Sequence, residues 1–155
     1  MSDYRLRVAS AADQDVLVHH RVAMFQDMGI HFDADAVGEE YRAWLLPQLR
    51  AGDYRAWVVE DDSGGVVAGG GLSILPWPPG PRYPGGRVAF VYNVYTEPAH
   101  RHRGLARRLM DAVHAFCRAE GITNVALNAS QFGKPLYESM GYAVTTSPMM
   151  FLSLE

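Results

Sequence analysis

Arginine and glycine gather in the hexapeptide RHRGLA, residues 101–106. It follows a run rich in β-branched and aromatic residues and precedes a helical pattern, so it stands where a helix begins after a strand. The first turn of a helix offers unpaired N–H groups and the positive end of its dipole, which together attract phosphate. Gly104 lets a ligand approach the backbone, and Ala106 keeps that surface shallow. Positive charge comes from Arg101, Arg103, Arg107 and Arg108. The segment is a candidate pyrophosphate site, although its three fixed points fit an ordinary helix start equally well.

Other phosphate-binding and metal-binding patterns do not fit the sequence. It has no G-x-x-x-x-G-K-[ST] loop, and no G-x-G-x-x-G follows a predicted strand, which argues against P-loop and dinucleotide-binding enzymes. The glycines at 69–71 lie inside an apparent strand, where a bulge or close packing is the expected reason for them. The six histidines show no ligand set, and His19 and His20 point in different directions on a helix. We expect no metal.

The elements that must position these residues begin with strand and helix patterns in the first half of the chain. Ser10 is a good helix cap, Gly29 a natural helix end, and Pro47 should kink or divide the second helix. The expected elements are a strand at 4–10, a helix at about 11–28, a second helix at about 34–50, and a hairpin of strands at 54–61 and 65–75.

The second half reads as a βαβ unit after a proline-rich loop. Residues 76–86 hold five of the nine prolines and must form a long loop, either functional or a rigid connection. Apolar residues then recur at helical spacing from Arg103 to Gly121. The expected elements are a strand at 87–97, a helix at about 103–120, a strand at 122–130, a short helix at 134–140, and one or two closing strands within 142–154.

Composition limits the class of protein. A chain of 155 residues fits one domain spanning 1–155, and its 48% apolar and 20% charged residues argue against disorder. The net charge of −3 disfavours a nucleic-acid-binding role for the arginine cluster. Cys117 is the only cysteine and should face the core, which disfavours a cysteine acyl-enzyme. Short, interrupted apolar runs and a polar start predict a complete cytoplasmic protein with no membrane partner.

Three segments taken together resemble a known family. NVYTEPAHRHRGLARRLMDAVHAF is followed by VALNAS and then by GKPLYESMGY. In order and spacing, residues 88–142 closely resemble the acetyl-CoA-binding half of the GNAT superfamily of N-acetyltransferases. The resemblance implies an α/β (α+β) fold with a mixed, mostly antiparallel sheet flanked by helices, in which a parallel strand pair is splayed to admit CoA.

The same resemblance implies a donor site for acetyl-CoA. The CoA pyrophosphate is expected on the backbone amides of the segment His102, Arg103, Gly104, Leu105, Ala106 and Arg107, with Arg101 beside them. The pantetheine arm is expected along the backbone of Val94, Tyr95 and Thr96, and the amide near Val94 would stabilise the developing oxyanion. Ser130 stands where many relatives have asparagine, and its shorter side chain weakens the expected contact with pantetheine. Gly133 likewise replaces a common alanine.

Tyr137 matches the usual general acid of the family, a phenol that protonates the departing thiolate. Packing of Leu136, Tyr137 and Met140 as one face of an amphipathic helix is the alternative that the short helix alone favours. A general base is not assigned. The strand at 87–97 carries no carboxylate in its interior, Glu97 beside Pro98 suits a turn, and a water chain touching Tyr92, Asn93 or His20 is an equal alternative.

The acceptor is the open part of the prediction. In this fold it approaches from the side of the first two helices and the proline-rich loop, where an apolar, aromatic-lined pocket would suit a small amine. The candidates are Phe25, Met28, Trp77, Tyr92 and Asn93, with Met24, Trp44 and Tyr83 nearby. We expect an N-acetyltransferase moving acetyl directly from acetyl-CoA to a primary amine of a small molecule. A non-catalytic acyl-CoA-binding or sensing module is the alternative, and the final MMFLSL or an exposed edge strand offers a surface for a homodimer.

Overall fold

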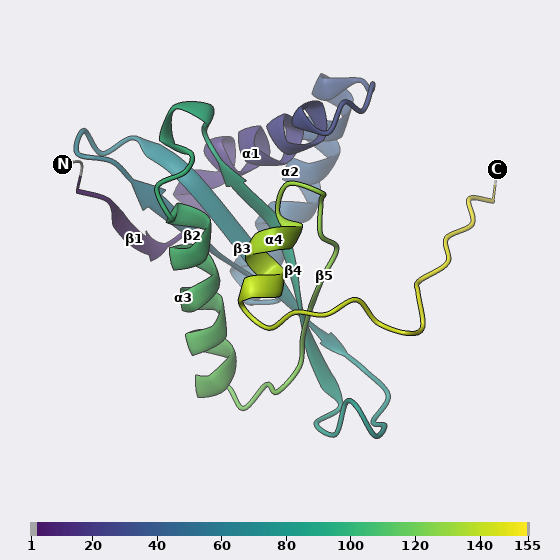
Figure 1. The fold of residues 1–155 in the computed structure, drawn as a ribbon. Coiled ribbons are helices and arrows are strands. Elements are labelled where there is room, and N and C mark those ends of the chain that lie inside the picture. Colours follow the sequence, from purple (N-terminus) through teal and green to yellow (C-terminus); the bar gives the residue numbers. More distant parts are fainter. Residues whose placement is uncertain (1–2, 155) are drawn as a thin grey trace.

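A computed structural model describes residues 3–154, so Met1, Ser2 and Glu155 of the expected domain lie outside the described residues. A five-stranded sheet in the order β1-β2-β3-β4-β5 carries helices on both faces (Figure 1). All neighbouring strands are antiparallel except β4 and β5, which are parallel. The predicted mixed fold class is confirmed.

The elements occur in the expected order. The strands are β1 (Arg5–Val8), β2 (Tyr54–Glu60), β3 (Val66–Pro76), β4 (Arg87–Thr96) and β5 (Val125–Leu127). The α-helices are α1 (Gln14–Asp27), α2 (Ala34–Ala51), α3 (Leu105–Ala119) and α4 (Lys134–Ser139), with short 3-10 turns at Ala11–Asp13 and Pro98–His100. Helix α2 continues through Pro47, so of the two predicted effects, a kink or a division, the division does not occur. Among the described residues, no helix is both long and apolar enough to cross a membrane.

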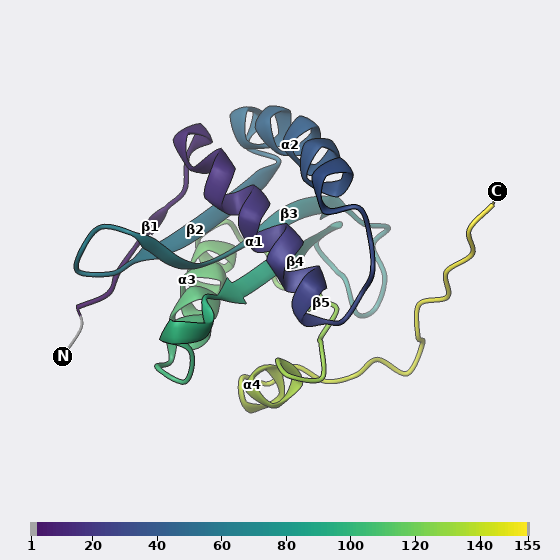
Figure 2. The same ribbon diagram turned by 90° about the horizontal axis from the view of Figure 1, so that it is seen from above.

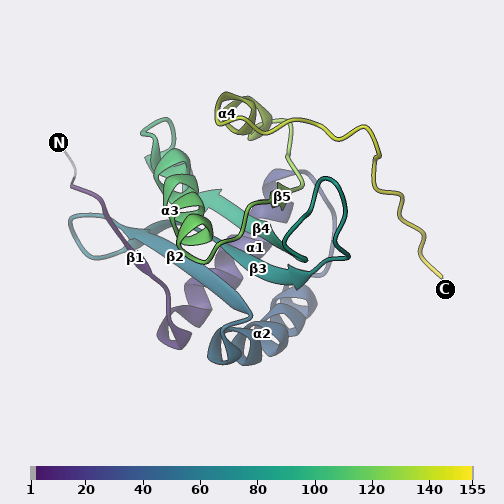
Figure 3. The ribbon, with the colours of Figure 1, turned by 90° about the horizontal axis from the view of Figure 1, so that it is seen from below.

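Helices α1 and α2 lie on one face of the sheet and α3 on the other (Figures 2 and 3). Two hydrophobic clusters hold them there. On one face, α1 and α2 pack over the sheet through residues that include Leu17, Tyr41, Leu45, Tyr54 and Val58. On the other face, α3 buries the stripe that its sequence period predicts, Leu105, Leu109, Val113 and Cys117, together with Met110. The sheet, including the C-terminal ends of β4 and β5, therefore lies between the layer of α1 and α2 and the layer of α3.

The closing strand expected within residues 142–154 is absent. This segment carries no strand, and residues 143–154 are exposed. A strand needs neighbouring backbone to pair with, and the segment runs away from the sheet of its own chain (Figure 1). Its β-like composition therefore did not suffice to add it to the sheet.

Candidate functional site

Strand β4 is interrupted by a bulge near its middle. Gly71 of β3 faces Tyr92, whereas Gly69 faces Tyr95, so Asn93 and Val94 both lie opposite Gly70. Asn93 adopts a positive φ of 62°, a conformation uncommon for a residue with a side chain. A bulge of this kind redirects the strand and its peptide groups.

Strands β4 and β5 part just before this bulge. They pair only between Ala89–Val91 and Val125–Leu127. From Tyr92 to Thr96, β4 has a strand neighbour only on its β3 side within residues 3–154. The backbone of Val94, Tyr95 and Thr96, expected to bind the pantetheine arm, therefore borders an opening in the sheet.

Helix α3 begins directly beyond this opening. Gly104 is its N-cap, with φ 77° and no side-chain cap, and Arg108 donates the first helical backbone bond to the Gly104 carbonyl at 3.1 Å. The preceding amides of the first turn, from Leu105 to Arg107, are the donors that a helix start leaves free. A Cβ built on Gly104 would meet no atom within 4 Å. The open space, free amides and helix dipole fit a pyrophosphate.

Most of the arginines around Gly104 are engaged in holding the fold. The Arg101 guanidinium donates to the Thr96 carbonyl at 2.8 Å and to the Asp27 carboxylate at the end of α1. Arg107 donates to Ser139 Oγ on α4 at 2.6 Å, and Arg108 donates to a backbone carbonyl near the N-terminus at 3.1 Å. We call the backbone amides from His102 to Arg107 the cradle. The arginine side chains fix α1, α4 and the β4–α3 loop around it, so its backbone N–H groups are the main hydrogen-bond donors available to an anion.

Tyr137 is the buried residue of α4, 9% exposed and in the same core cluster as Leu105. Burial raises the pKa of its hydroxyl, which keeps the phenol protonated at neutral pH. A Cβ on Gly133 would lie 2.8 Å from Tyr137 Cε2, so glycine at this position makes room for the ring. Ser130 Oγ accepts from the Gly133 amide at 3.2 Å and so supports the start of α4.

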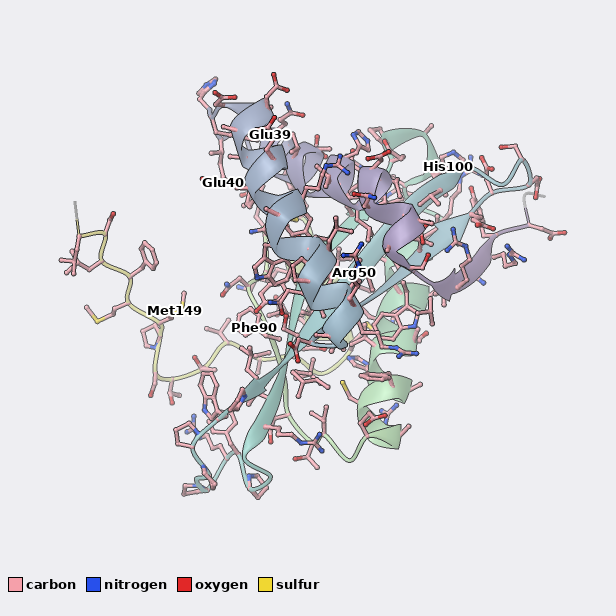
Figure 4. All side chains as sticks on the ribbon, turned by 180° about the vertical axis from the view of Figure 1, so that it is seen from behind. Glu39, Glu40, Arg50, Phe90, His100 and Met149 are labelled. Atoms are coloured by element: carbon pink, nitrogen blue, oxygen red, sulfur yellow. The ribbon has the colours of Figure 1, made fainter. Side chains whose placement is uncertain are left out.

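On the opposite face of the sheet, α1, α2 and β4 enclose a pocket of about 320 Å³. Figure 4 views this face, with Glu40 near the N-terminal end of α2 and Phe90 on the strand behind it. The pocket is lined by Arg21, Val37, Glu40, Tyr41, Trp44, Tyr92 and Asn93. It shares Asn93 with the β4 bulge, which places it next to the opening between β4 and β5.

A hydrogen-bond network forms the floor of this pocket. Asn93 Nδ2 donates to the hydroxyls of Tyr41 at 2.9 Å and Tyr54 at 3.1 Å, and Asn93 Oδ1 accepts from Arg21 at 2.8 Å. Burial raises the pKa of both tyrosines, so neither can act as a base near neutral pH. Arg21 also lies over the rings of Phe25 and Tyr41, at 4.7 and 5.3 Å from their centroids. The guanidinium is therefore held in place.

The structure brings together some of the predicted acceptor residues and not others. Tyr92 and Asn93 line the pocket, and Phe25 supports Arg21. Met28, which is 48% exposed, and Trp77, which packs on Tyr83 in the β3–β4 loop, do not line it. Val37, Glu40 and Tyr41 also line the pocket but were not among the predicted acceptor residues, although their i, i+3, i+4 spacing places them on one helical face.

The groups considered for proton removal also have defined places. His20 is 1% exposed against Gly69, and burial lowers its pKa to about 4, so its imidazole is neutral at pH 7. Glu97 accepts from His19 Nε2 at 2.7 Å near the surface.

Cys117, the only candidate for a cysteine acyl-enzyme, is buried among core residues, and burial raises the pKa of its thiol. No group of three potential metal ligands occurs in the part of the chain that the structure describes.

These features define an α/β domain with an opening between its two parallel strands and a separate pocket on the far side of a bulged strand. Residues 20–142 match the model of the Acetyltransferase (GNAT) family, and the chain belongs to this family.

Two solved structures are similar over nearly the whole chain. A GCN5-related N-acetyltransferase from Ralstonia eutropha JMP134 is 34% identical, with a TM-score of 0.88 covering 97% of this chain and 99% of that one. A predicted acetyltransferase from Clostridium acetobutylicum, solved with acetyl-CoA, is 26% identical, with a TM-score of 0.88 covering 98% and 96%.

A curated relative is similar over a shorter stretch. Probable N-acetyltransferase family 8 member 5 of Mus musculus is 34% identical over an alignment of 94 residues, and the match covers 57% of this chain. The match spans 38% of the length of the mouse protein.

Proposed function

We propose that the chain transfers an acetyl group from acetyl-CoA directly to a primary amine of a small molecule. The observation that carries this proposal is the position of Asn93, which belongs both to the β4 bulge beside the donor opening and to the floor of the 320 Å³ pocket. Donor and acceptor can therefore approach the same peptide groups from opposite faces of the sheet. The solved relative with acetyl-CoA supports the choice of donor.

The residues of the chain divide the work between them. The amides from His102 to Arg107 would hold the pyrophosphate, and the backbone of Val94, Tyr95 and Thr96 would hold the arm. Acetyl-CoA supplies a thioester whose carbonyl carbon accepts an amine and whose sulfur leaves. The peptide N–H near Val94 donates to the oxygen that gains negative charge, and such a preorganised donor stabilises the transition state. Tyr137, kept protonated by burial, donates its proton to the departing sulfur.

Direct transfer is favoured over a cysteine intermediate. Cys117 is 2% exposed in the core under α3, and its raised pKa keeps the thiol protonated and unreactive. The amine must lose a proton before it attacks. Since β4 offers no carboxylate in its interior, this proton passes to water in the pocket.

The pocket further supports an acceptor with a carboxylate or similar anionic group. Arg21 lines the pocket and, within residues 3–154, has no carboxylate within 4.0 Å. Its guanidinium is held by Asn93 and two aromatic rings, and a fixed guanidinium is well suited to a carboxylate. Trp44 and Tyr92 add apolar walls. An amino-acid-like amine with an apolar body matches these three contributions.

The test uses acetyl-CoA and a panel of amines in matched pairs, each pair carrying a carboxylate in one member and a carboxamide in the other. Release of free thiol is followed for each amine. We expect amine-dependent release that is faster for the carboxylate members. Binding of acetyl-CoA without release for any amine would contradict catalysis and leave the non-catalytic module, whereas equal use of both members would contradict the role of Arg21.

A pair of variants sharpens the result. Arg21→Gln should lower kcat/KM for the carboxylate members by about tenfold to a hundredfold and leave the carboxamide members nearly unchanged, because only the former lose a charged hydrogen bond. Arg118→Gln, on the exposed end of α3, is the matched control and should change neither.

A further inference from the structure

The C-terminal segment is apolar and extended, yet it lies in water. The side chains of its last six described residues include five large apolar ones, which are 74–92% exposed: Met149, Met150, Phe151, Leu152 and Leu154. Contiguous apolar surface of this kind marks an interaction site. In Figure 4 the segment, marked by Met149, stands apart from the body of the protein.

The path of the segment leads away from the sheet of its own chain. Thr146 Oγ1 accepts from the Arg82 guanidinium at 3.4 Å, which places the segment against the proline-rich loop between β3 and β4. Beyond this point Figures 1 and 3 show the chain continuing outward, on the side away from β1 and β2. The segment does not pair with any strand of its own chain within the described residues.

The sheet has an open edge that lacks such a strand. Strand β5 is the last in the sheet and pairs only with β4. On one face of this edge, Val125 and Leu127 pack against the α3 cluster. On the other face, Phe90 and Tyr92 of β4 stack at 5.0 Å between ring centroids and are only half-buried. Unpaired backbone with apolar side chains on both faces is a template for another strand.

The pattern of the segment matches this edge. With a period of two, Met150, Leu152 and Leu154 share one face of a strand, and Met149 and Phe151 share the other. Apolar residues on both faces are typical of a strand covered on both sides rather than an edge facing water. A strand added beside β5 would continue the apolar surface of Val125 and Leu127 on the α3 face and the surface that begins with Phe90 and Tyr92 on the other face.

We propose that two copies of the chain exchange their C-terminal strands, residues 149–154 of each copy pairing along β5 of the other. A second copy is the occupant that the structure favours, because each chain carries both the segment and the edge and its segment leads outward. A two-fold arrangement then buries both segments along both copies of β5, and because the exchange is reciprocal it is complete with two copies.

The first test is the mass in solution by light scattering after size exclusion. The full chain should elute at twice its mass of 17.2 kDa. Leu152→Asp should raise the concentration at which the dimer half-dissociates by at least about a hundredfold, since a charge would be buried between strands. Val144→Asp is the matched control, because Val144 is 78% exposed in the same segment but precedes the proposed strand. A monomeric full chain, or a Leu152→Asp variant that stays dimeric, would overturn the proposal.

A second test separates exchange from folding back. A chain carrying both Ala126→Cys on β5 and Phe151→Cys is oxidised and run on a denaturing gel without reductant, with Phe151→Cys alone as control. Exchange predicts covalent dimers for the double variant only. A disulfide within one chain, seen as a monomer that migrates faster than its reduced form, would show that the segment returns to its own sheet and would overturn the proposal. Circular dichroism of each variant confirms that it is folded.

Discussion

The cradle at the start of α3 and the pocket between α1 and α2 lie on opposite sides of β4, and they are built from different parts of the chain. The cradle uses backbone groups of a short continuous segment around Gly104, with nearby side chains largely holding the fold. The pocket uses side chains from three elements, fixed by the bonds of Asn93. The proposed donor side therefore depends on few side chains, whereas the proposed acceptor side depends on several.

Removing the hydroxyl of Tyr137 should have the largest effect of any change on the donor side. Tyr137→Phe should lower kcat by about 100-fold to 10,000-fold, the usual contribution of a general acid, and leave acetyl-CoA affinity nearly unchanged. Burial raises the pKa of Tyr137, so the alkaline loss of kcat in the unaltered chain should fall above the ordinary value near 10 and vanish in the variant. Steady-state kinetics against pH and calorimetric binding measure both quantities.

Tyr142→Phe is the control for this change. Tyr142 contacts the Tyr137 ring edge-on, and its hydroxyl lies 2.7 Å from His114 Nε2, away from the proposed chemistry. An unchanged kcat in Tyr137→Phe, or an equal loss of kcat in Tyr142→Phe, would show that Tyr137 is not the general acid.

A charge in the cradle should have the next largest effect. Gly104→Glu should weaken acetyl-CoA binding by roughly a hundredfold or more, because like charges brought together cost several kcal/mol. Gly121→Glu at the other end of α3 is the control. Both glycines have positive φ, 77° and 70°, and open space around the Cβ position, so both variants carry the same backbone strain. Equal acetyl-CoA affinity in the two variants would show that the cradle does not bind the donor.

On the acceptor side, a buried histidine should make stability depend on pH. Burial lowers the pKa of His20 from 6.5 to about 4, so the unfolded chain binds the extra proton between these values. The free energy of unfolding should therefore be highest above about pH 6.5 and fall by roughly 3 kcal/mol as the pH drops to about 4. Denaturant unfolding at several pH values measures this change.

His20→Gln should remove the part of the slope between pH 6.5 and 4, and His31→Gln, on the exposed loop after α1, should retain it. The lowered pKa of Asp13, caused by its bond to Arg7, acts at lower pH and remains in both variants. A slope that survives in His20→Gln would place its origin elsewhere.

Much of the donor side was predictable from the sequence because its signals are local. The period of α3, the position of Gly104 and the short helix with Tyr137 all follow from neighbouring residues, and the structure places them as expected. The three glycines at 69–71 were expected to mark a bulge or close packing, and the structure shows both. Gly70 faces the bulge, and a Cβ on Gly71 would collide with the Tyr54 ring.

The acceptor pocket was less predictable because its residues meet only after folding. Arg21, Tyr41 and Asn93 come from three elements, and no local sequence pattern predicts the hydrogen bonds between them. Trp77 was chosen for its residue type, but it packs within its own loop. The prediction of a closing strand within residues 142–154 was wrong for a related reason. Composition favours a strand there, but whether a partner strand lies within reach depends on the whole fold.

Asn93 belongs both to the β4 bulge and to the pocket floor. The smallest predicted effect, a difference in stability between two variants, separates its backbone conformation from its side-chain hydrogen bonds. Asn93→Ala should destabilise the fold by about 1–3 kcal/mol, because Tyr41, Tyr54 and Arg21 lose a buried partner. Asn93→Gly loses the same bonds but accepts the φ of 62° without strain, so it should be more stable than the alanine variant by about 1 kcal/mol. Denaturant unfolding compares the two. If alanine equals or exceeds glycine, the bulge is not held in the left-handed region in solution, and the link between the donor strand and the acceptor pocket rests on the side chain alone.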